Sequence, residues 1–281
     1  WTPVLLSTLH TLGVTPDFLV EHQYQYGPGA ENDAKLLSGL DAGGWTISHV
    51  ANGQLRAMLK DYLPDGTRVQ LLQTEIGTVW ANPGKQSVNL PGGLAMAVMV
   101  GDSIKTEYRA TDWWLWQDNY VNTDPKRFNL SPALYGWRLY GHYGVARFDA
   151  KLGKPERHPV FYIARMLGKF LRDGDTVYEC TSSEPLLKIY CVRHMTGSLS
   201  VLVVNTAPDT NYSHVRITLT GCKARGTATV WTYGKANDDA ARDQRPGQDL
   251  TRSTQAVFGS TITRSFPQYS ATLMTFRSAP N

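Results

Sequence analysis

Apolar residues recur with a helical period over four stretches in the first part of the chain. These stretches predict helices over residues 2–12, 47–62, 92–105 and 160–171. Short runs of apolar and aromatic residues lie between them and predict strands at residues 18–20, 69–74 and 108–116. Strands that alternate with helices in this way are typical of βα units around a parallel sheet.

The pattern changes after Gly174 to short apolar runs with turn residues between them. We expect strands at residues 176–180, 186–192, 199–204, 214–219, 227–232, 256–258, 261–263 and 272–276. Many short strands of this kind indicate a β-sandwich. The chain therefore divides into an α/β part, residues 1–173, and an all-β part, residues 174–281. Residues 122–158 and 237–250 are expected to form long loops.

The second predicted strand ends on a carboxylate, Glu75, and Gly77 follows two residues later. His22 and Tyr24 follow the first predicted strand. Because the carboxyl ends of parallel strands meet at one edge of a sheet, these three side chains are expected to lie together. A Tyr hydroxyl or a His N–H donating to Glu75 would hold one carboxylate oxygen and stabilise its charge. Taken alone, Glu75 could be a solvated acid, and His22 and Tyr24 could be core residues with satisfied hydrogen bonds.

The third predicted strand ends in a cluster of tryptophans followed by polar side chains. Strand alternation places Trp114 and Trp116 on one face and Trp113 on the other, beneath a helix. Flat aromatic faces flanked by amides and carboxylates suit the apolar faces of sugar rings. The residues expected to bind substrate are His22, Tyr24, Trp80, Trp114, Trp116, Gln117 and Asn119. Aromatic residues also fill protein cores, so the eight Trp and fourteen Tyr residues do not by themselves establish binding.

Other acids and other catalytic motifs find less support in the sequence. Glu21 points to the opposite side of its strand from His22, and Glu107 begins its strand; Asp112 and Asp118 are also weaker candidates than Glu75. The chain holds no Gly-x-Gly-x-x-Gly after a strand, no phosphate loop and no Gly-x-Ser-x-Gly elbow. Its seven histidines have no metal-ligand spacing, so we expect neither a metal nor a cofactor.

Composition and charge limit the partners of the chain. Its 281 residues are 42% hydrophobic, which is ample for a packed core. The net charge of +4 comes from scattered residues without basic runs, so we expect no nucleic acid and no membrane partner. The chain opens on Trp1 without a signal peptide, and we expect its true N-terminus to have been removed or to lie on another polypeptide. Glycosylation-type triplets at Asn129 and Asn211 are compatible with a secreted, extracellular or periplasmic protein.

The three cysteines, Cys180, Cys191 and Cys222, lack metal-ligand spacing. Cys180 and Cys191 lie on two runs that could pair as a hairpin. A disulfide between them is therefore possible in an oxidising compartment, and a pair of inert buried thiols is the alternative.

Several of these stretches together carry a resemblance to a known group of enzymes. Residues 17–24, with His22 and Tyr24, resemble the sixth strand of that group's barrel; residues 72–77 resemble the seventh strand with its nucleophile, and residues 111–116 the eighth. Residues 200–205 and 266–273 are similar to the last strands of its sandwich. The group consists of retaining glycoside hydrolases with a (β/α)8 TIM barrel followed by a β-sandwich, and the closest resemblance is to α-L-arabinofuranosidases and β-xylosidases.

The resemblance implies a fold and a mechanism for this chain. Residues 1–173 would be the C-terminal portion of the catalytic barrel, strands six to eight, and residues 174–281 the sandwich. Glu75 would be the nucleophile of a double displacement that cleaves glycosidic bonds of plant-type or other polysaccharides and oligosaccharides. An α-L-arabinofuranoside is the first expectation for the substrate; a β-xylosidase or a β-glucuronidase or heparanase-like enzyme is the alternative.

The acid that would act with Glu75 is missing from the chain. In the family it is a Glu that follows an Asn at the end of the fourth strand, and no Asn-Glu pair precedes the first predicted helix. Three strands cannot close a barrel, so a second polypeptide or an N-terminal fragment is expected to supply strands one to five and the acid/base. A hypothesis from a different class is a non-catalytic subunit that binds carbohydrate or serves in assembly.

Overall fold

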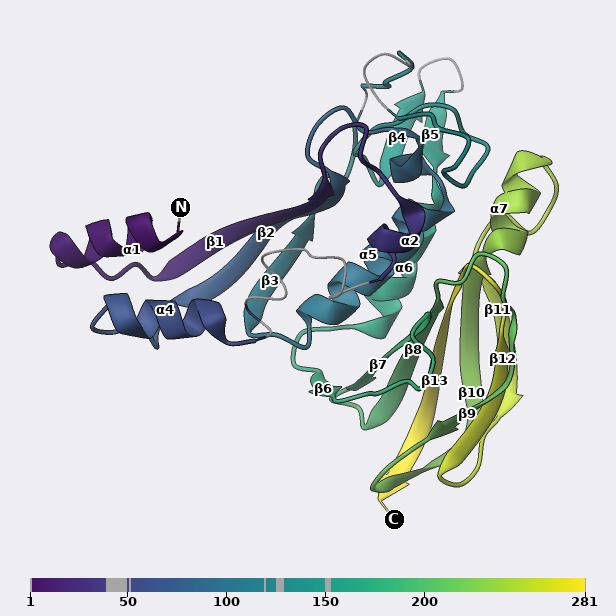
Figure 1. The fold of residues 1–281 in the computed structure, drawn as a ribbon. Helices are drawn as coiled ribbons and strands as arrows, with labels where there is room; N and C mark the ends of the chain where they lie inside the picture. The colour runs from purple at the N-terminus through teal and green to yellow at the C-terminus, as the bar shows by residue number, and fades with distance from the viewer. Residues whose placement is uncertain are drawn as a thin grey trace.

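The structure, a computed structural model, describes residues 2–38, 50, 52–118, 120–124, 129–149 and 153–280. A layer formed by helices α5 (Leu90–Ser103) and α6 (Pro159–Phe170) lies at its centre. A small parallel sheet lies on one side of this layer and a β-sandwich on the other (Figure 1). Every other element is arranged around these three layers.

The parallel sheet confirms the βα alternation expected from the sequence. Its strands run in the order β1 (Phe18–Tyr26), β2 (Gln70–Val79) and β3 (Tyr108–Trp113), and both pairings are parallel. Helix α4 (Gln54–Tyr62) lies between β1 and β2 in the chain, and α5 lies between β2 and β3. The shorter elements of this part are α1 (Thr2–Thr11), α2 (Asp33–Leu36) and the 3-10 helix η2 (Lys85–Val88). Residues 47–49 and 51 of the helix predicted over 47–62 lie outside the described residues, and none of the described helices is long and apolar enough to cross a membrane.

The predicted ends of all three strands are wrong. β1 continues past residue 20 to Tyr26, so His22 and Tyr24 lie inside it. β2 continues past Glu75 to Val79 because its pairing with β1 continues to Tyr26 opposite Val79, and Glu75 therefore lies inside the strand. β3 ends at Trp113, before the rest of the tryptophan cluster. The pairing of β1 with β2 shifts register between Glu21 and His22, which is typical of a β-bulge.

The sandwich predicted for the second half of the chain is present as two facing sheets of unequal size. The larger sheet has the antiparallel order β11-β10-β13-β8-β7-β6, and the smaller one pairs β12 with β9. The strands are β6 (Thr176–Tyr178), β7 (Leu187–Arg193), β8 (Ser198–Asn205), β9 (Tyr212–Thr218), β10 (Cys222–Gly234), β11 (Thr251–Ala256), β12 (Thr261–Phe266) and β13 (Ser270–Pro280). Helix α6 ends before β6 begins, close to the domain boundary expected near residue 173.

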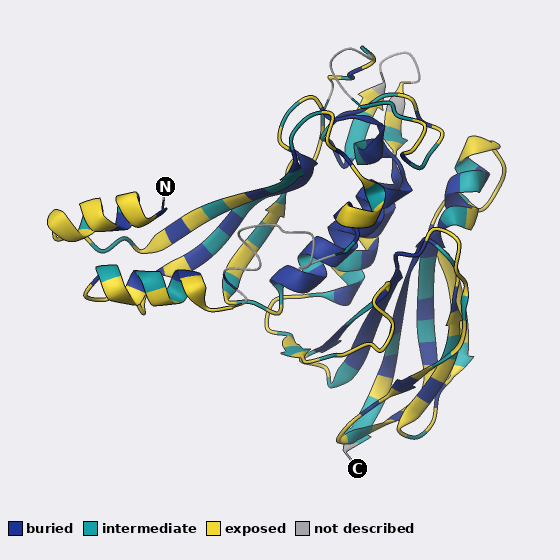
Figure 2. Cartoon of the chain, viewed as in Figure 1, coloured by how far each residue is buried: buried dark blue, intermediate teal, exposed yellow. Residues whose placement is uncertain are grey.

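The six-stranded sheet is covered on both faces, which explains its unbroken hydrophobic runs. Leu202 and Val204 of β8 pack into the same core as α5 and α6, whereas Val201 and Val203 pack into the core shared with β9 and β12. A strand that alternates between two buried faces needs apolar residues at consecutive positions. Figure 2 shows the same double burial, with α5 buried along nearly its whole length.

Two stretches expected to be loops contain regular structure. The first, residues 122–158, includes the hairpin of β4 (Ala146–Asp149) and β5 (Lys154–Arg157). The second, residues 237–250, begins inside helix α7 (Lys235–Arg242). Asn237 is buried because its side chain donates to the carbonyl oxygens of Gly247 and Asp249 and accepts from the Gly234 amide. A polar side chain such as Asn237 can be buried when its hydrogen bonds are satisfied.

Helix α5 packs very closely on the six-stranded sheet at Gly101. A Cβ atom at this position would lie 2.5 Å from Cζ of Tyr190, a fully buried side chain of β7. The hydroxyl of Tyr190 donates to Asp102 on the same helix at 3.0 Å. The absence of a side chain at residue 101 therefore sets the distance between the helix layer and the sandwich.

We expect Gly101→Ala to lower the free energy of unfolding by about 1–3 kcal/mol, because the added methyl group forces Tyr190 or the helix to move within a packed core. Gly168→Ala in α6 is the matched control: no atom lies within 4 Å of the Cβ position at this exposed glycine. That substitution should stabilise the protein by about 0.5–1 kcal/mol through helix propensity. Urea denaturation of both variants measures the two effects, and equal stabilities would contradict the packing argument.

Candidate active site

Glu75 lies on the central strand of the parallel sheet, directly beside His22 of β1 in the strand pairing. The Tyr24 hydroxyl donates to Oε2 of Glu75 at 2.8 Å. Nδ1 of His22 lies 3.5 Å from the same oxygen, and its Nε2 lies 3.0 Å from the hydroxyl of Thr74. The structure thus brings together the three residues predicted to meet. Tyr24 and His22 both contact Oε2 of Glu75, and neither contacts Oε1.

Gly77 explains how the Tyr24 ring reaches the carboxylate from the neighbouring strand. A Cβ atom on residue 77 would lie 2.8 Å from Cε1 of Tyr24, closer than real Cβ contacts come. The glycine two residues after Glu75 is therefore required for the Tyr24–Glu75 hydrogen bond. Burial first, and then the hydrogen bond to Glu75, raise the pKa of Tyr24 well above its usual range, so Tyr24 stays protonated and donates.

A second tyrosine, Tyr143, reaches the site from the long segment after β3. The Leu115 amide donates to the Tyr143 carbonyl at 3.3 Å, and the Val145 amide donates back to the Leu115 carbonyl at 2.8 Å. Asp118 accepts from the Tyr143 amide at 3.0 Å. Burial, and then the negative charges of Asp118 and Glu75, raise the pKa of Tyr143 to about 12. The sequence predicted only a long loop over this segment. Asp118, a competing acid in the sequence analysis, holds the segment in place.

The tryptophans predicted to contact sugar are exposed at the same edge of the sheet. Trp80 is 63% exposed, Trp114 41% and Trp116 66%. Trp80 lies against the turn after β1, because its Nε1 is 3.1 Å from the Cβ position of Gly27. Trp113 packs against the core that contains α5, as expected. The argument from strand alternation does not apply to Trp114 and Trp116, since β3 ends before them.

The remaining predicted site residues are less informative. Gln117 forms an isolated bridge with Ala146, which places it at the base of the β4–β5 hairpin. Asn119 lies outside the described residues. Glu107 pairs with Arg56 at 2.9 Å, at the start of β3. The Glu75 side chain makes hydrogen-bond and ion-pair contacts with Tyr24 and His22 in the described part of the chain, and neither partner is a second carboxylate.

A pair of buried histidines lies beneath the segment that carries Tyr143. The rings of His142 and His158 are 4.7 Å apart between centroids, and both side chains are fully buried. None of their four ring nitrogens has a hydrogen-bond partner among the described residues. Burial is the main cause that lowers the pKa of His142 to about 4, and burial lowers the pKa of His158 well below the usual range. Both imidazoles are therefore neutral. Within the same described residues, no group of three His, Cys, Asp or Glu side chains could hold a metal ion.

The comparisons with known proteins identify the fold. No protein-family model matches the chain, and no curated protein matches it in sequence. The α-L-arabinofuranosidase from Thermotoga maritima, solved as an arabinose complex, matches with a TM-score of 0.63 at 12% identity over 99% of this chain and 56% of its own. A GH51 arabinofuranosidase from Xanthomonas axonopodis gives 0.59 at 14% identity, covering 99% and 55%. A GH39 β-xylosidase from Caulobacter crescentus gives 0.61 at 13% identity, also covering 99% and 55%.

These matches show that the resemblance noted in the sequence holds at the level of fold. At such low identity they show the fold alone. The chain spans about half the length of these enzymes, which agrees with the expected resemblance to a part of such a protein. The roles of the individual site residues remain predictions.

We expect the stability of the protein to fall as the pH drops from about 6.5 to about 4, because the unfolded chain binds protons that buried, neutral His142 does not. Asp118 and Glu156 oppose this shift of the pKa and Arg147 reinforces it. For His142 alone the loss is about 3 kcal/mol in the free energy of unfolding. Denaturant titrations at about pH 7 and about pH 4 should show a smaller loss for His142→Asn than for the parent protein. His214→Asn, which changes an exposed histidine, should leave the loss unchanged.

Proposed function

We propose that this chain is the nucleophile-bearing part of a retaining glycoside hydrolase. The observation that carries the proposal is the Glu75 carboxylate, held through one oxygen by Tyr24 and His22 at an aromatic edge of a parallel sheet. The fold shared with arabinofuranosidases and a β-xylosidase supports it. In this role Glu75 attacks the anomeric carbon with its second oxygen, Oε1, and forms a covalent glycosyl-enzyme that water then hydrolyses.

The neighbours of Glu75 suit this chemistry. A nucleophile must remain ionised and must point one lone pair at the anomeric carbon. The hydrogen bond from Tyr24 orients the carboxylate, and His22 is itself held by Thr74. Trp80, Trp114 and Trp116 present exposed aromatic surface on which a sugar ring could stack, and Gln117 and Asn119 complete the proposed binding set.

The proposal requires a second polypeptide or an N-terminal fragment that supplies the remaining barrel strands and the acid/base. The second acid of a retaining pair lies about 5 Å from the nucleophile, and it is not among the contacts of Glu75 in the described residues. β1 is one of the two edge strands of the sheet, and its Phe18 and Val20 side chains are 54% and 39% exposed. Apolar side chains on an open sheet face require a covering layer.

An α-L-arabinofuranoside is the proposed substrate, since two of the structural neighbours are arabinofuranosidases. A β-xyloside comes next, because the Caulobacter neighbour is a β-xylosidase. A β-glucuronide is less favoured: its carboxylate would need a basic partner, and the described hydrogen-bond and ion-pair contacts around Glu75 include no Lys or Arg.

Glu75→Gln, introduced into the assembled enzyme, should lower turnover of an aryl arabinofuranoside by several powers of ten while leaving the unfolding transition unchanged. Glu21→Gln is the matched control, because Glu21 precedes His22 on β1 and makes no contact with Glu75 among the described residues. It should retain most of the turnover. Near-normal activity of Glu75→Gln would refute the proposal.

A 2-fluoro-arabinofuranosyl fluoride should label the protein on the tryptic peptide of residues 69–85, which contains Glu75. The experiment also distinguishes the alternative function. Saturable binding of arabino-oligosaccharides without any covalent label would support a non-catalytic carbohydrate-binding or assembly subunit.

Tyr24→Phe should lower kcat by about 10²-fold, because Glu75 loses a positioned hydrogen bond. The strength of that bond changes during the reaction, as the carboxylate loses its negative charge on bonding to the anomeric carbon. KM should change much less, since the ring and its packing on Gly77 remain. Steady-state kinetics of the assembled enzyme measures both values, and a change confined to KM would assign Tyr24 to substrate binding alone.

A further inference from the structure

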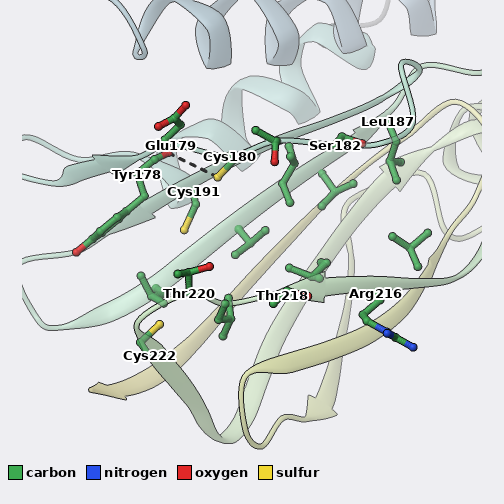
Figure 3. A pocket seen from close by; sticks show the side chains of 18 of the residues that line it. Tyr178, Glu179, Cys180, Ser182, Leu187, Cys191, Arg216, Thr218, Thr220 and Cys222 are labelled. Atoms are coloured by element: carbon green, nitrogen blue, oxygen red, sulfur yellow. Dashed lines mark hydrogen bonds between the residues drawn. The ribbon is translucent and has the colours of Figure 1, made fainter. Parts of the chain in front are cut away.

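The sandwich contains a cavity of about 840 Å³ that plays no part in the proposed active site. It is lined by apolar side chains of β7, β8 and β9 together with polar side chains of the segment between β6 and β7, and all three cysteines of the chain line it (Figure 3). Three thiols at one cavity are unexpected in a chain with so few cysteines. We propose that Cys180 and Cys191 are a redox-active dithiol that closes to a disulfide at the edge of the six-stranded sheet.

The strand pairing places the two cysteines together. Tyr178, the last residue of β6, lies directly opposite Cys191 of β7. Cys180 follows two residues later and lines the same cavity as both of them. Cys180 lies just beyond the end of β6, and the register of the pairing makes it the diagonal neighbour of Cys191. The Cys180 thiol donates to the Tyr178 carbonyl at 3.6 Å, and it lies near enough to the Cys191 thiol for each to shift the pKa of the other.

The surroundings distinguish an attacking thiol from a resolving one. The hydrogen bond from Cys191, and then the nearby Lys105 ammonium, lower the pKa of Cys180 against the opposing effect of burial. Cys180 is partly exposed, whereas Cys191 is only 9% exposed and its pKa is raised by the hydrogen bond to Cys180 and by burial. A partly exposed thiol with a lowered pKa is the one that reacts first with an external disulfide.

The reaction is a thiol–disulfide exchange with a low-molecular-weight disulfide such as glutathione disulfide. The Cys180 thiolate attacks one sulfur of the oxidant, which forms a mixed disulfide and releases one glutathione thiolate. Cys191 then loses its proton to solvent and displaces the second glutathione. Two cysteine thiols are oxidised by two electrons, and one glutathione disulfide is reduced to two glutathione molecules.

The disulfide would stabilise the shortest strand of the large sheet. β6 is an edge strand of three residues that pairs only with β7. Its connection to β7, residues 179–186, contains no helix or strand. A disulfide across this connection reduces the freedom of the unfolded chain and ties β6 to β7. Formation of the bond should therefore be visible as a change in thermal stability.

The experiment uses the whole purified chain, equilibrated with glutathione disulfide and then alkylated to trap free thiols. Tryptic mapping should find the peptide of residues 173–188 linked to the peptide of residues 189–193, with the mass of two hydrogen atoms lost. Cys222, on the peptide of residues 217–223, should remain free. Oxidation should also raise the midpoint of thermal unfolding by about 5 °C, and Cys180→Ser should abolish this shift.

Cys222→Ser is the matched control, because Cys222 lines the same cavity but no hydrogen bond joins it to either other cysteine within the described residues. This variant should keep both the linked peptide and the thermal shift. Three results would overturn the proposal: a link that involves Cys222, a lasting glutathione adduct on Cys180 without closure, or three free thiols after equilibration. The mapping of the parent protein decides between these results even if Cys180→Ser folds poorly.

Discussion

The burial of the six-stranded sheet on both faces is the constraint on which the other layers depend. Alternate residues of β8 belong to two different cores, one shared with α5 and α6 and the other with β9 and β12. Helix α5 can reach the sheet because residue 101 is glycine and the Tyr190 ring occupies the space of its side chain. The same helix connects β2 to β3, so the position of the parallel sheet follows from its packing. The sandwich thereby supports the strand that carries Glu75.

The parallel sheet differs from the large sheet because no layer of the described residues covers the face that presents the site. Phe18 and Val20 are exposed there, and His22 continues the same face toward Glu75. An open face lets a sugar approach the carboxylate, but it also leaves apolar side chains in water. The proposed second polypeptide accounts for both features, since it would cover the apolar part of the face and bring the missing acid to the site. The three-stranded sheet by itself would neither cover its apolar face nor supply the second acid.

Much of the polar structure around the site depends on contacts between distant segments. Arg138 forms a buried ion pair with Asp238 at 2.7 Å, across 100 residues of sequence. Asp118 fixes the segment that presents Tyr143, 25 residues further along. These side chains resemble ordinary surface residues when only the sequence is considered, because nothing local shows that a partner will arrive. A buried charge or amide is stable only when that partner is present.

The sequence alone determined the order and type of the main elements and the meeting of Glu75, His22 and Tyr24. The elements follow from local periodicity, and the structure confirms them. The three side chains do meet, but inside β1 and β2, where His22 pairs with Glu75, rather than beyond the ends of the strands. Only the tertiary structure decided that β2 continues past Glu75, that β3 stops at Trp113 and that residues 235–242 form a helix. It also showed why Gly77 is needed and which segment brings Tyr143 to the site. Strand ends, close approaches and satisfied polar groups depend on the neighbour across the chain, and a one-dimensional pattern does not contain that neighbour.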